Sequence, residues 1–415
     1  MLKKMPYLVA VTFLGVYPMA DTYVLIPAMT EIAQAMPGVG QTMINFILTI
    51  PSLMTIPASI LAGRLVGSGY LSKKGCVLLG SAIFTLGGLT GGLVVDIRYL
   101  LFTRAVLGFG NGLITAMVVA VAIDYFTDRE TASVMGIFSA ASNVLAIGLT
   151  VVSGYLVLLN WRYCFAVYLV GGLIIIYHAR VLKKNPERPV DENDPAAEPP
   201  ASEPGKQEPV SAAPDASHGK LGRTFFALLA VAIVIKTLGN SLYLALSYFI
   251  EGQGLGDAAD TGLANGIMTM AIGLSGFAFG LVYGRLKAWT AITFFLLMAA
   301  GNLLLARSFT FAGAVAALVV WALGHGLTVP YLLRETIVRS PRHLITFSGA
   351  LMNSVIYVAF VLSTFIQPLV ARLVNTDDLR VFFNVVGLVL AAGGLLIGLY
   401  SLAARKGSLS PKRKV

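Results

Sequence analysis

The chain has 415 residues, of which 57% are hydrophobic and only 12% are charged. Soluble domains carry roughly 25% charged residues, because a surface in water must be covered largely by polar groups. The composition therefore excludes an ordinary soluble protein and favours a membrane protein. The two cysteines, Cys76 and Cys164, lie inside apolar segments, so no disulfide framework is indicated.

Apolar runs long enough to cross a bilayer, about 20 residues each, recur in two sets of six. The predicted spans are 7–29, 41–62, 75–95, 98–124, 133–158 and 161–182, then 224–250, 261–284, 289–306, 310–333, 344–371 and 380–403. We expect the first run to remain as a span, since it is too long for a signal peptide. The sequence predicts an all-α membrane protein with twelve transmembrane helices in two six-helix bundles.

The segment between the two sets is dense in Pro, Glu, Asp, Ala and Ser and has almost no large apolar residues. Such a segment cannot bury a core, so we expect a disordered linker. The predicted organisation is a six-helix bundle over 1–182, a cytoplasmic linker over 183–223, a second bundle over 224–404, and a basic cytoplasmic tail over 405–415.

Lysine and arginine are unevenly distributed between the two sides of the predicted spans. Of the 30, 23 fall on the side of the N-terminus, 5 fall on the opposite side, and Arg104 and Lys236 lie within spans. Under the positive-inside rule this asymmetry places both termini in the cytoplasm of a multi-pass protein of the plasma (inner) membrane. It also accounts for the net charge of +10, so no nucleic-acid partner is predicted.

Matching motifs at matching spans indicate that the halves are duplicates of each other. The paired motifs are Gly63-Arg64-Leu65 with Gly284-Arg285-Leu286 at the ends of spans 2 and 8, Gly110-Asn111-Gly112-Leu113 with Gly324-His325-Gly326-Leu327 in spans 4 and 10, and Asn143 with Asn353 in spans 5 and 11. A parallel six-helix repeat is typical of one large class of secondary transporters.

Together with the long central loop, these features resemble the major facilitator superfamily over nearly the whole chain. Three local patterns resemble motifs of this family. Arg104 with Gly108 and Gly112 is similar to the fourth-span motif of proton-coupled members, and Asp21-Thr22 followed by Pro27 is similar to the first-span acidic motif of drug:proton antiporters. Asn160-Trp161-Arg162-Tyr163 is similar to the residues that commonly open the sixth span in the family. Two patterns depart from the family. The loop over 63–74 lacks the usual Asp, and span 5 lacks the Gly-Pro pair of typical antiporters.

Ionisable residues inside a span are costly and usually mark a pathway. Asp21 and Arg104 both lie roughly 9–12 Å below the same boundary, at about 1.5 Å per helical residue, so a contact between them is possible. A proton on Asp21 could then compete with Arg104 for the carboxylate, although a structural ion pair is the competing interpretation. His325 could also transfer a proton, since its ordinary pKa is near 6.5, but a neutral His bonded to a neighbouring helix is equally open. The candidate proton-coupling residues are Asp21, Arg104 and His325.

Polar residues also recur at helical spacing on spans that, in the resembled family, line the central cavity. Single Asn residues often join helices, but stripes on several helices together favour a shared aqueous cavity. The candidate substrate-binding residues are Tyr17, Asn45, Arg104, Asn111, Asn143, Lys236, Asn240, Tyr243, Asn265, His325, Asn353 and Tyr357. Lys236 could attract an anionic group, or it could pair with backbone carbonyls.

The sequence predicts a proton-coupled secondary active transporter of small organic solutes that works by alternating access. Efflux of amphipathic compounds and uptake or exchange of an organic anion both remain open, and a non-transporting membrane receptor or scaffold is the alternative of a different class. No P-loop, metal-spaced His/Cys cluster or nucleophile elbow is present, so neither an enzyme, a cofactor nor a metal is expected. The expected partners are a small organic substrate, protons and the lipid bilayer, and the expected state is a monomer.

Overall fold

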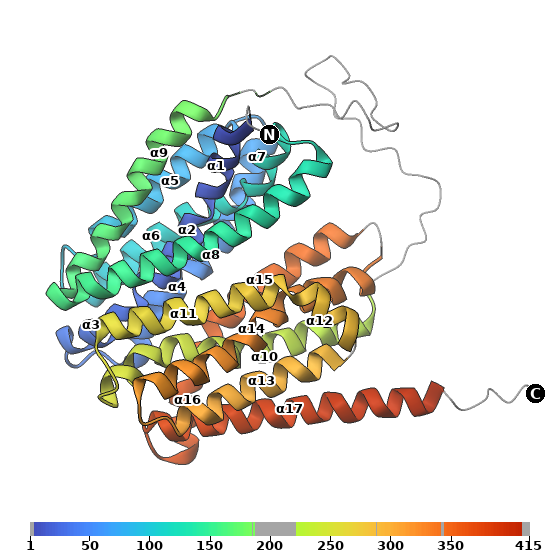
Figure 1. The fold of residues 1–415 in the computed structure, drawn as a ribbon. Helices are drawn as coiled ribbons and strands as arrows, with labels where there is room; N and C mark the ends of the chain where they lie inside the picture. The colour runs from blue at the N-terminus through green and yellow to red at the C-terminus, as the bar shows by residue number, and fades with distance from the viewer. Residues whose placement is uncertain (1–3, 185, 187–220, 288, 342–343, 409–415) are drawn as a thin grey trace, which may run out of the picture.

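The computed structural model describes residues 4–184, 186, 221–287, 289–341 and 344–408, and these form two groups of helices packed side by side (Figure 1). The first half comprises α1 (Met5–Leu14), α2 (Val16–Tyr23), the 3-10 helix η2 (Ile26–Ala28), α3 (Met29–Ala35), α4 (Gln41–Gly67), α5 (Lys73–Thr90), α6 (Ile97–Thr115), α7 (Val118–Tyr125), α8 (Asp128–Leu159), the 3-10 helix η3 (Trp161–Tyr168) and α9 (Leu169–Val181). The second comprises α10 (Arg223–Gly252), α11 (Ala258–Phe277), α12 (Phe279–Leu286), α13 (Trp289–Ala306), α14 (Phe311–Arg339), α15 (Ile345–Ser363), α16 (Ile366–Val374) and α17 (Leu379–Ser408). The predicted linker lies largely outside the described residues.

Within the described residues, nine helices are long and apolar enough to cross a membrane, and two bent pairs raise the number to eleven. The bent pairs are α11 with α12, at 54°, and the part of α15 from Phe347 onward with α16, at 44°. The remaining predicted span coincides with α5, whose first two residues are lysines. The all-α membrane fold is thus confirmed, whereas the exact number of twelve stays a prediction.

The helix ends follow ordinary capping chemistry. Thr127 and Glu130 form a capping box at the start of α8, and Asp257 and Asp260 form another at the start of α11. Asp96 accepts a hydrogen bond from the Tyr99 N–H at the start of α6. These side chains satisfy backbone donors that the first turn of a helix leaves unpaired.

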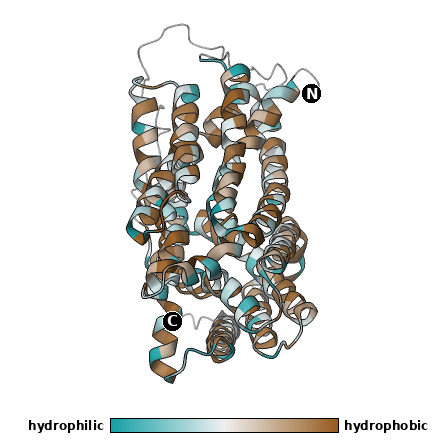
Figure 2. Ribbon diagram, turned by 90° about the vertical axis from the view of Figure 1, so that its left-hand side faces the viewer, coloured by the Kyte–Doolittle hydropathy of each residue, from teal (hydrophilic) through white to brown (hydrophobic). Residues whose placement is uncertain are grey.

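Hydrophobic residues occupy much of the length of the helices (Figure 2), and many of their side chains are exposed. Phe277 is 91% exposed, and Leu159 and Leu373 are also largely exposed. Exposed apolar side chains on this scale are rare on monomers in water but suit a surface that faces lipid.

The two halves repeat the same packing pattern. In the first half α6 packs against α4 and α5, and α5 packs against α9. In the second half α14 packs against α11 and α13, and α13 packs against α17. In predicted span numbers, the contacts 2–4, 3–4 and 3–6 recur as 8–10, 9–10 and 9–12, which agrees with the duplication expected from the motifs.

The halves meet mainly through α8 with α11 and α4 with α15. Several specific contacts between the halves gather toward the end where α3 lies and α4 begins, which we call the closed end. The hydroxyls of Thr30 and Ser247 are 2.7 Å apart, and those of Thr49 and Thr364 are 3.0 Å apart. Gln367 Nε2 also donates to Gln41 Oε1 at 3.1 Å. At the opposite end, the ion pairs Lys4–Glu130 and Lys73–Asp124 each join elements of the first half alone.

Candidate functional site

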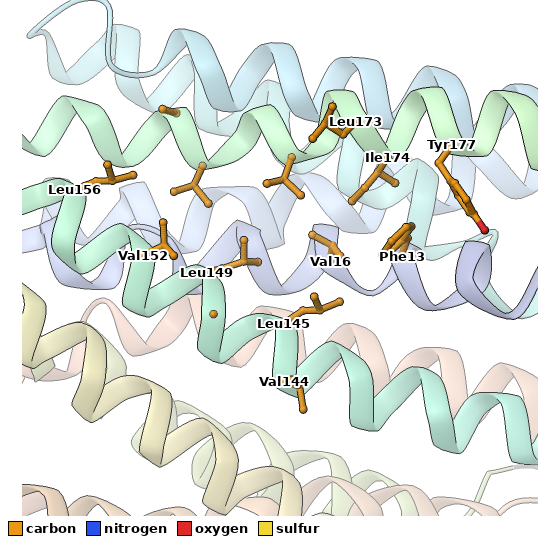
Figure 3. A pocket seen from close by; sticks show the side chains of 14 residues that line it. Phe13, Val16, Val144, Leu145, Leu149, Val152, Leu156, Leu173, Ile174 and Tyr177 are labelled. Carbon is orange, nitrogen blue, oxygen red and sulfur yellow. The ribbon is translucent and has the colours of Figure 1, made fainter. Parts of the chain in front are cut away.

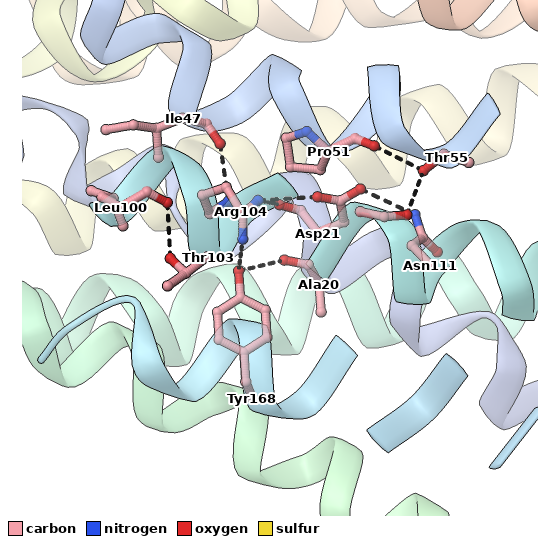
Figure 4. Close-up of polar contacts among 11 residues, drawn as sticks. Ala20, Asp21, Ile47, Pro51, Thr55, Leu100, Thr103, Arg104, Asn111 and Tyr168 are labelled. Atoms are coloured by element: carbon pink, nitrogen blue, oxygen red, sulfur yellow. Dashed lines mark hydrogen bonds and ion pairs between the residues drawn. The ribbon is translucent and has the colours of Figure 1, made fainter. Parts of the chain in front are cut away.

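A buried ion pair joins α2 and α6 in the first half (Figure 4). Arg104 on α6 places Nη2 3.0 Å from Asp21 Oδ1 on α2, and Asn111 Nδ2 donates to Asp21 Oδ2 at 3.1 Å. Arg104 and Asn111 are seven residues apart and so share one face of α6. The contact expected between Asp21 and Arg104 is present, and Asn111 adds a neutral partner.

The guanidinium of Arg104 is fixed by further bonds and is fully buried. Its Nε donates to the Ile47 carbonyl at 3.0 Å and its Nη1 to Tyr168 Oη at 2.7 Å, while Nη2 also donates to the backbone carbonyl of Asp21. Tyr168 in turn donates to the Ala20 carbonyl at 3.2 Å. The guanidinium therefore ties together α2, α4, α6 and η3, and would keep several partners if Asp21 lost its charge.

The second half holds a buried pair of nitrogen bases. Lys236 Nζ on α10 lies 2.9 Å from His325 Nε2 on α14. The imidazole stacks on Trp321 at 4.5 Å between ring centroids and meets the Tyr243 ring edge-on at 5.9 Å. If the ammonium donates to Nε2, the imidazole is neutral with its proton on Nδ1. His325 Nδ1 has no hydrogen-bond partner among the described residues.

The other predicted site residues divide into those that are buried and those that are not. Tyr17, Asn45, Asn240, Tyr243 and Asn265 are buried, whereas Asn143 and Tyr357 are half-buried and Asn353 is exposed. Burial alone does not test whether these residues bind a substrate, so their predicted role stays a prediction. The buried members are at most 6% exposed.

Several of these side chains already have structural partners. Asn265 Nδ2 donates to Thr150 Oγ1 across the two halves at 3.0 Å, and Asn143 Nδ2 donates to the Ser139 carbonyl at 2.8 Å. Tyr17 Oη donates to the Gly171 carbonyl on α9 at 3.4 Å. The ring of Tyr243 lies 6.1 Å from that of Tyr23, so this pair spans the two halves.

Sequence reasoning missed Tyr168, which belongs to the Arg104 cluster. A lone Tyr carries no periodic signal that would mark it as part of a site. It also missed the carboxyls Glu31 and Glu251, because each lies just beyond a predicted span. Among the described residues, no group of three or more His, Cys, Asp or Glu side chains is arranged to hold a metal ion.

A separate crevice of about 730 Å³ lies between α1, α8, η3 and α9 (Figure 3). Its lining includes Phe13, Val16, Leu149, Leu156 and Ile174, and it is almost wholly apolar. A surface of this kind can accommodate hydrocarbon but offers no charged side chain, so the polar chemistry lies in the two buried clusters.

The paired helical halves and their buried ionisable clusters define a polytopic membrane transporter. The chain belongs to the Major Facilitator Superfamily, whose family model matches residues 11–364. It is 27% identical over 161 residues to a multidrug transporter protein, MdtP, of Bacillus subtilis (strain 168), a match that covers 37% of this chain and 29% of that protein. The chain thus spans less than a third of the length of the curated relatives it matches.

Solved structures share the fold at low sequence identity. A bacterial homologue of the human lysosomal transporter Spinster, in an inward-facing conformation, has a TM-score of 0.71 at 14% identity, covering 94% of this chain and 96% of that one. A D-xylose–proton symporter has a TM-score of 0.70 at 11% identity, covering 95% and 97%. These likenesses establish the fold and leave the solute open.

Proposed function

We propose that this protein is a proton-coupled secondary active transporter of small organic solutes that works by alternating access. The observation that carries the proposal is Asp21, a carboxyl buried in the first half and paired with Arg104 at 3.0 Å. Buried ionisable groups in membrane helices are expensive and usually functional. A proton on Asp21 removes the ion pair, so the charge of the cluster, and with it the arrangement of α2 and α6, depends on protonation.

His325 is the second proposed proton-coupling residue. Its Nε2 lies against Lys236, so protonating the imidazole places two positive charges 2.9 Å apart. That arrangement is unfavourable unless an anion is present or Lys236 moves away. Proton uptake in the second half is therefore coupled to the charge of whatever binds there.

The charge balance favours an organic anion as the solute. Asp21 and Arg104 neutralise each other, whereas Lys236 forms no ion pair with an acidic residue in the part of the chain that the structure describes. A buried ammonium without a counter-ion is costly, and an anionic solute offsets that cost. In this proposal Lys236 binds the anionic group, while Asn240 and Tyr243 orient the solute.

Efflux of amphipathic compounds is the second candidate. It is favoured by the similarity to the Bacillus subtilis multidrug transporter protein over 161 residues. In that case the amphipathic solute would occupy the space between the halves, and Asp21 would take up a proton when the solute leaves.

We place the protein in the plasma (inner) membrane with both termini in the cytoplasm, as the distribution of Lys and Arg favours. The closed end then faces outward. The hydrogen bonds Thr30–Ser247 and Thr49–Thr364 would have to break for the opposite conformation.

The proposal is tested by counterflow in proteoliposomes, with and without a pH gradient, against organic anions and cationic drugs. Accumulation that requires the gradient supports coupled transport, and the class of solute that accumulates decides between the two candidates. A folded, reconstituted protein that moves no solute of either class under either condition would favour a receptor or scaffold.

A further inference from the structure

Two carboxyl side chains from opposite halves meet at the closed end. Glu31 lies on α3, two residues beyond the first predicted span, and Glu251 lies near the end of α10. The hydroxyl of Thr30, the residue before Glu31, contacts that of Ser247, which donates to Glu251, so the two carboxyls are neighbours across the halves. Both are half-buried, and Oε2 of Glu31 is a buried oxygen without a donor among the described residues.

The surroundings of this pair are polar but not basic. Ser247 donates to Glu251 Oε1 at 2.7 Å and lies 2.7 Å from the Thr30 hydroxyl, and Thr261 donates to the same Glu251 oxygen at 3.4 Å. The further titratable groups near the pair are Asp257 at the start of α11, Tyr248 on α10 and Cys164 on η3.

Neither carboxyl has a cation to compensate its charge. No Lys or Arg of the described residues forms an ion pair with Glu31 or Glu251. Two neighbouring carboxylates without a cation repel each other when both are ionised, but one proton shared between them permits a hydrogen bond.

We propose that Glu31 and Glu251 form a proton-holding latch that stabilises the closed end of the transporter. In the closed conformation the pair shares one proton. When the halves separate at this end, each carboxyl is solvated alone, and a solvated Glu ionises above a pKa of about 4.3. The closed conformation therefore binds more protons than the open one, so its population falls as pH rises.

This latch is distinct from the coupling proposed for Asp21. Its proton is taken up and released on the side of the closed end, because the pair comes apart only when that end opens. It therefore sets how the conformational equilibrium depends on the pH of that side.

The test is a spin-label distance measurement on the full chain in nanodiscs between pH 5 and pH 8. Labels are attached to Pro37→Cys and Asp377→Cys, which are exposed positions on the two halves at the closed end, with Cys76→Ala and Cys164→Ala as background. We expect the short-distance population to be about threefold or more larger at pH 5 than at pH 8. Glu251→Gln and Glu31→Gln, which keep a hydrogen bond without an added proton, should each remain largely closed at both pH values.

Asp96→Asn is the control, since it also converts a carboxyl to an amide, at an exposed position that is not part of the pair, and keeps a capping oxygen. It should retain the pH response. A pH response that survives in both Gln variants would overturn the proposal and assign the titration to another group, such as Asp21. A background protein with no pH response, or a closed population that follows sodium concentration instead of pH, would also overturn it.

Discussion

Asn111 and His325 occupy equivalent positions in the two halves. Each lies between two glycines on the central helix of its half, and each contacts an ionisable residue on the first span of that half, Asp21 at 3.1 Å and Lys236 at 2.9 Å respectively. The duplicated fold thus presents one acid-centred and one base-centred cluster at matching positions. This asymmetry of charge is the basis of the proposed coupling between proton and solute.

Removing the charge of Lys236 should weaken binding of an organic anion. A hydrogen bond to a charged group contributes about 1.5–3 kcal/mol, so Lys236→Gln should reduce affinity roughly ten- to hundredfold. Equilibrium binding to the reconstituted protein measures this change. Lys184→Gln, at an exposed position, serves as the control and should bind normally. Unchanged affinity in Lys236→Gln would show that Lys236 is structural.

Glycine at 108 is required by the close approach of α6 to α4. A Cβ at Gly108 would lie 2.3 Å from the Cα and the carbonyl oxygen of Pro51, and backbone atoms cannot move aside as a side chain can. We expect Gly108→Ala to lower stability by about 1–3 kcal/mol. Gly63→Ala, where a Cβ meets nothing within 4 Å, is the matched control and should be neutral or slightly stabilising. Thermal unfolding in detergent compares the two, and equal midpoints would contradict the packing argument.

Tyr168→Phe tests whether the phenol positions Arg104. The substitution removes the oxygen that accepts from Arg104 at 2.7 Å and donates to the Ala20 carbonyl. Leaving a buried charged donor without its partner should cost about 1–3 kcal/mol of stability and reduce coupled transport. Tyr163→Phe, at a position 55% exposed, should do neither. Wild-type unfolding and transport in Tyr168→Phe would show that the other bonds suffice to hold Arg104.

The ion pair Lys4–Glu130 should give a pH-dependent contribution to stability. Hydrogen bonds from Lys4 and Thr127 lower the pKa of Glu130 below its ordinary value. Its stabilising contribution is therefore fully present above the ordinary Glu pKa of about 4.3 and is lost as pH falls through the lowered pKa. Glu130→Gln should unfold at a lower temperature than wild type at pH 7, with the gap closing in strong acid. A gap that is constant with pH would refute this.

The helices and the family could be predicted because apolar runs, Lys and Arg placement and repeated Gly motifs are local signals. The contact of Asp21 with Arg104 could also be anticipated from their equal depth. The partners Tyr168 and Glu251 could not, since their positions depend on how η3 and α10 pack. Neither could the bend at α11–α12, which has no proline near the break. The bend at α15–α16 does carry a sequence signal, because Pro368 has no N–H to donate to the Thr364 carbonyl at the break.

The central claim is that Asp21 carries the coupling proton, and uphill transport by Asp21→Asn in proteoliposomes tests it most directly. The amide cannot ionise, but its single oxygen can still accept from Arg104, which also keeps its bonds to the Ile47 carbonyl and Tyr168, so the fold and the movement of the halves should persist. We predict that accumulation driven by a pH gradient is lost while downhill exchange of solute continues, with Asp96→Asn as a control that behaves like wild type. Uphill transport by Asp21→Asn at the wild-type rate, with unchanged pH dependence, would contradict the account and leave Asp21 a purely structural residue.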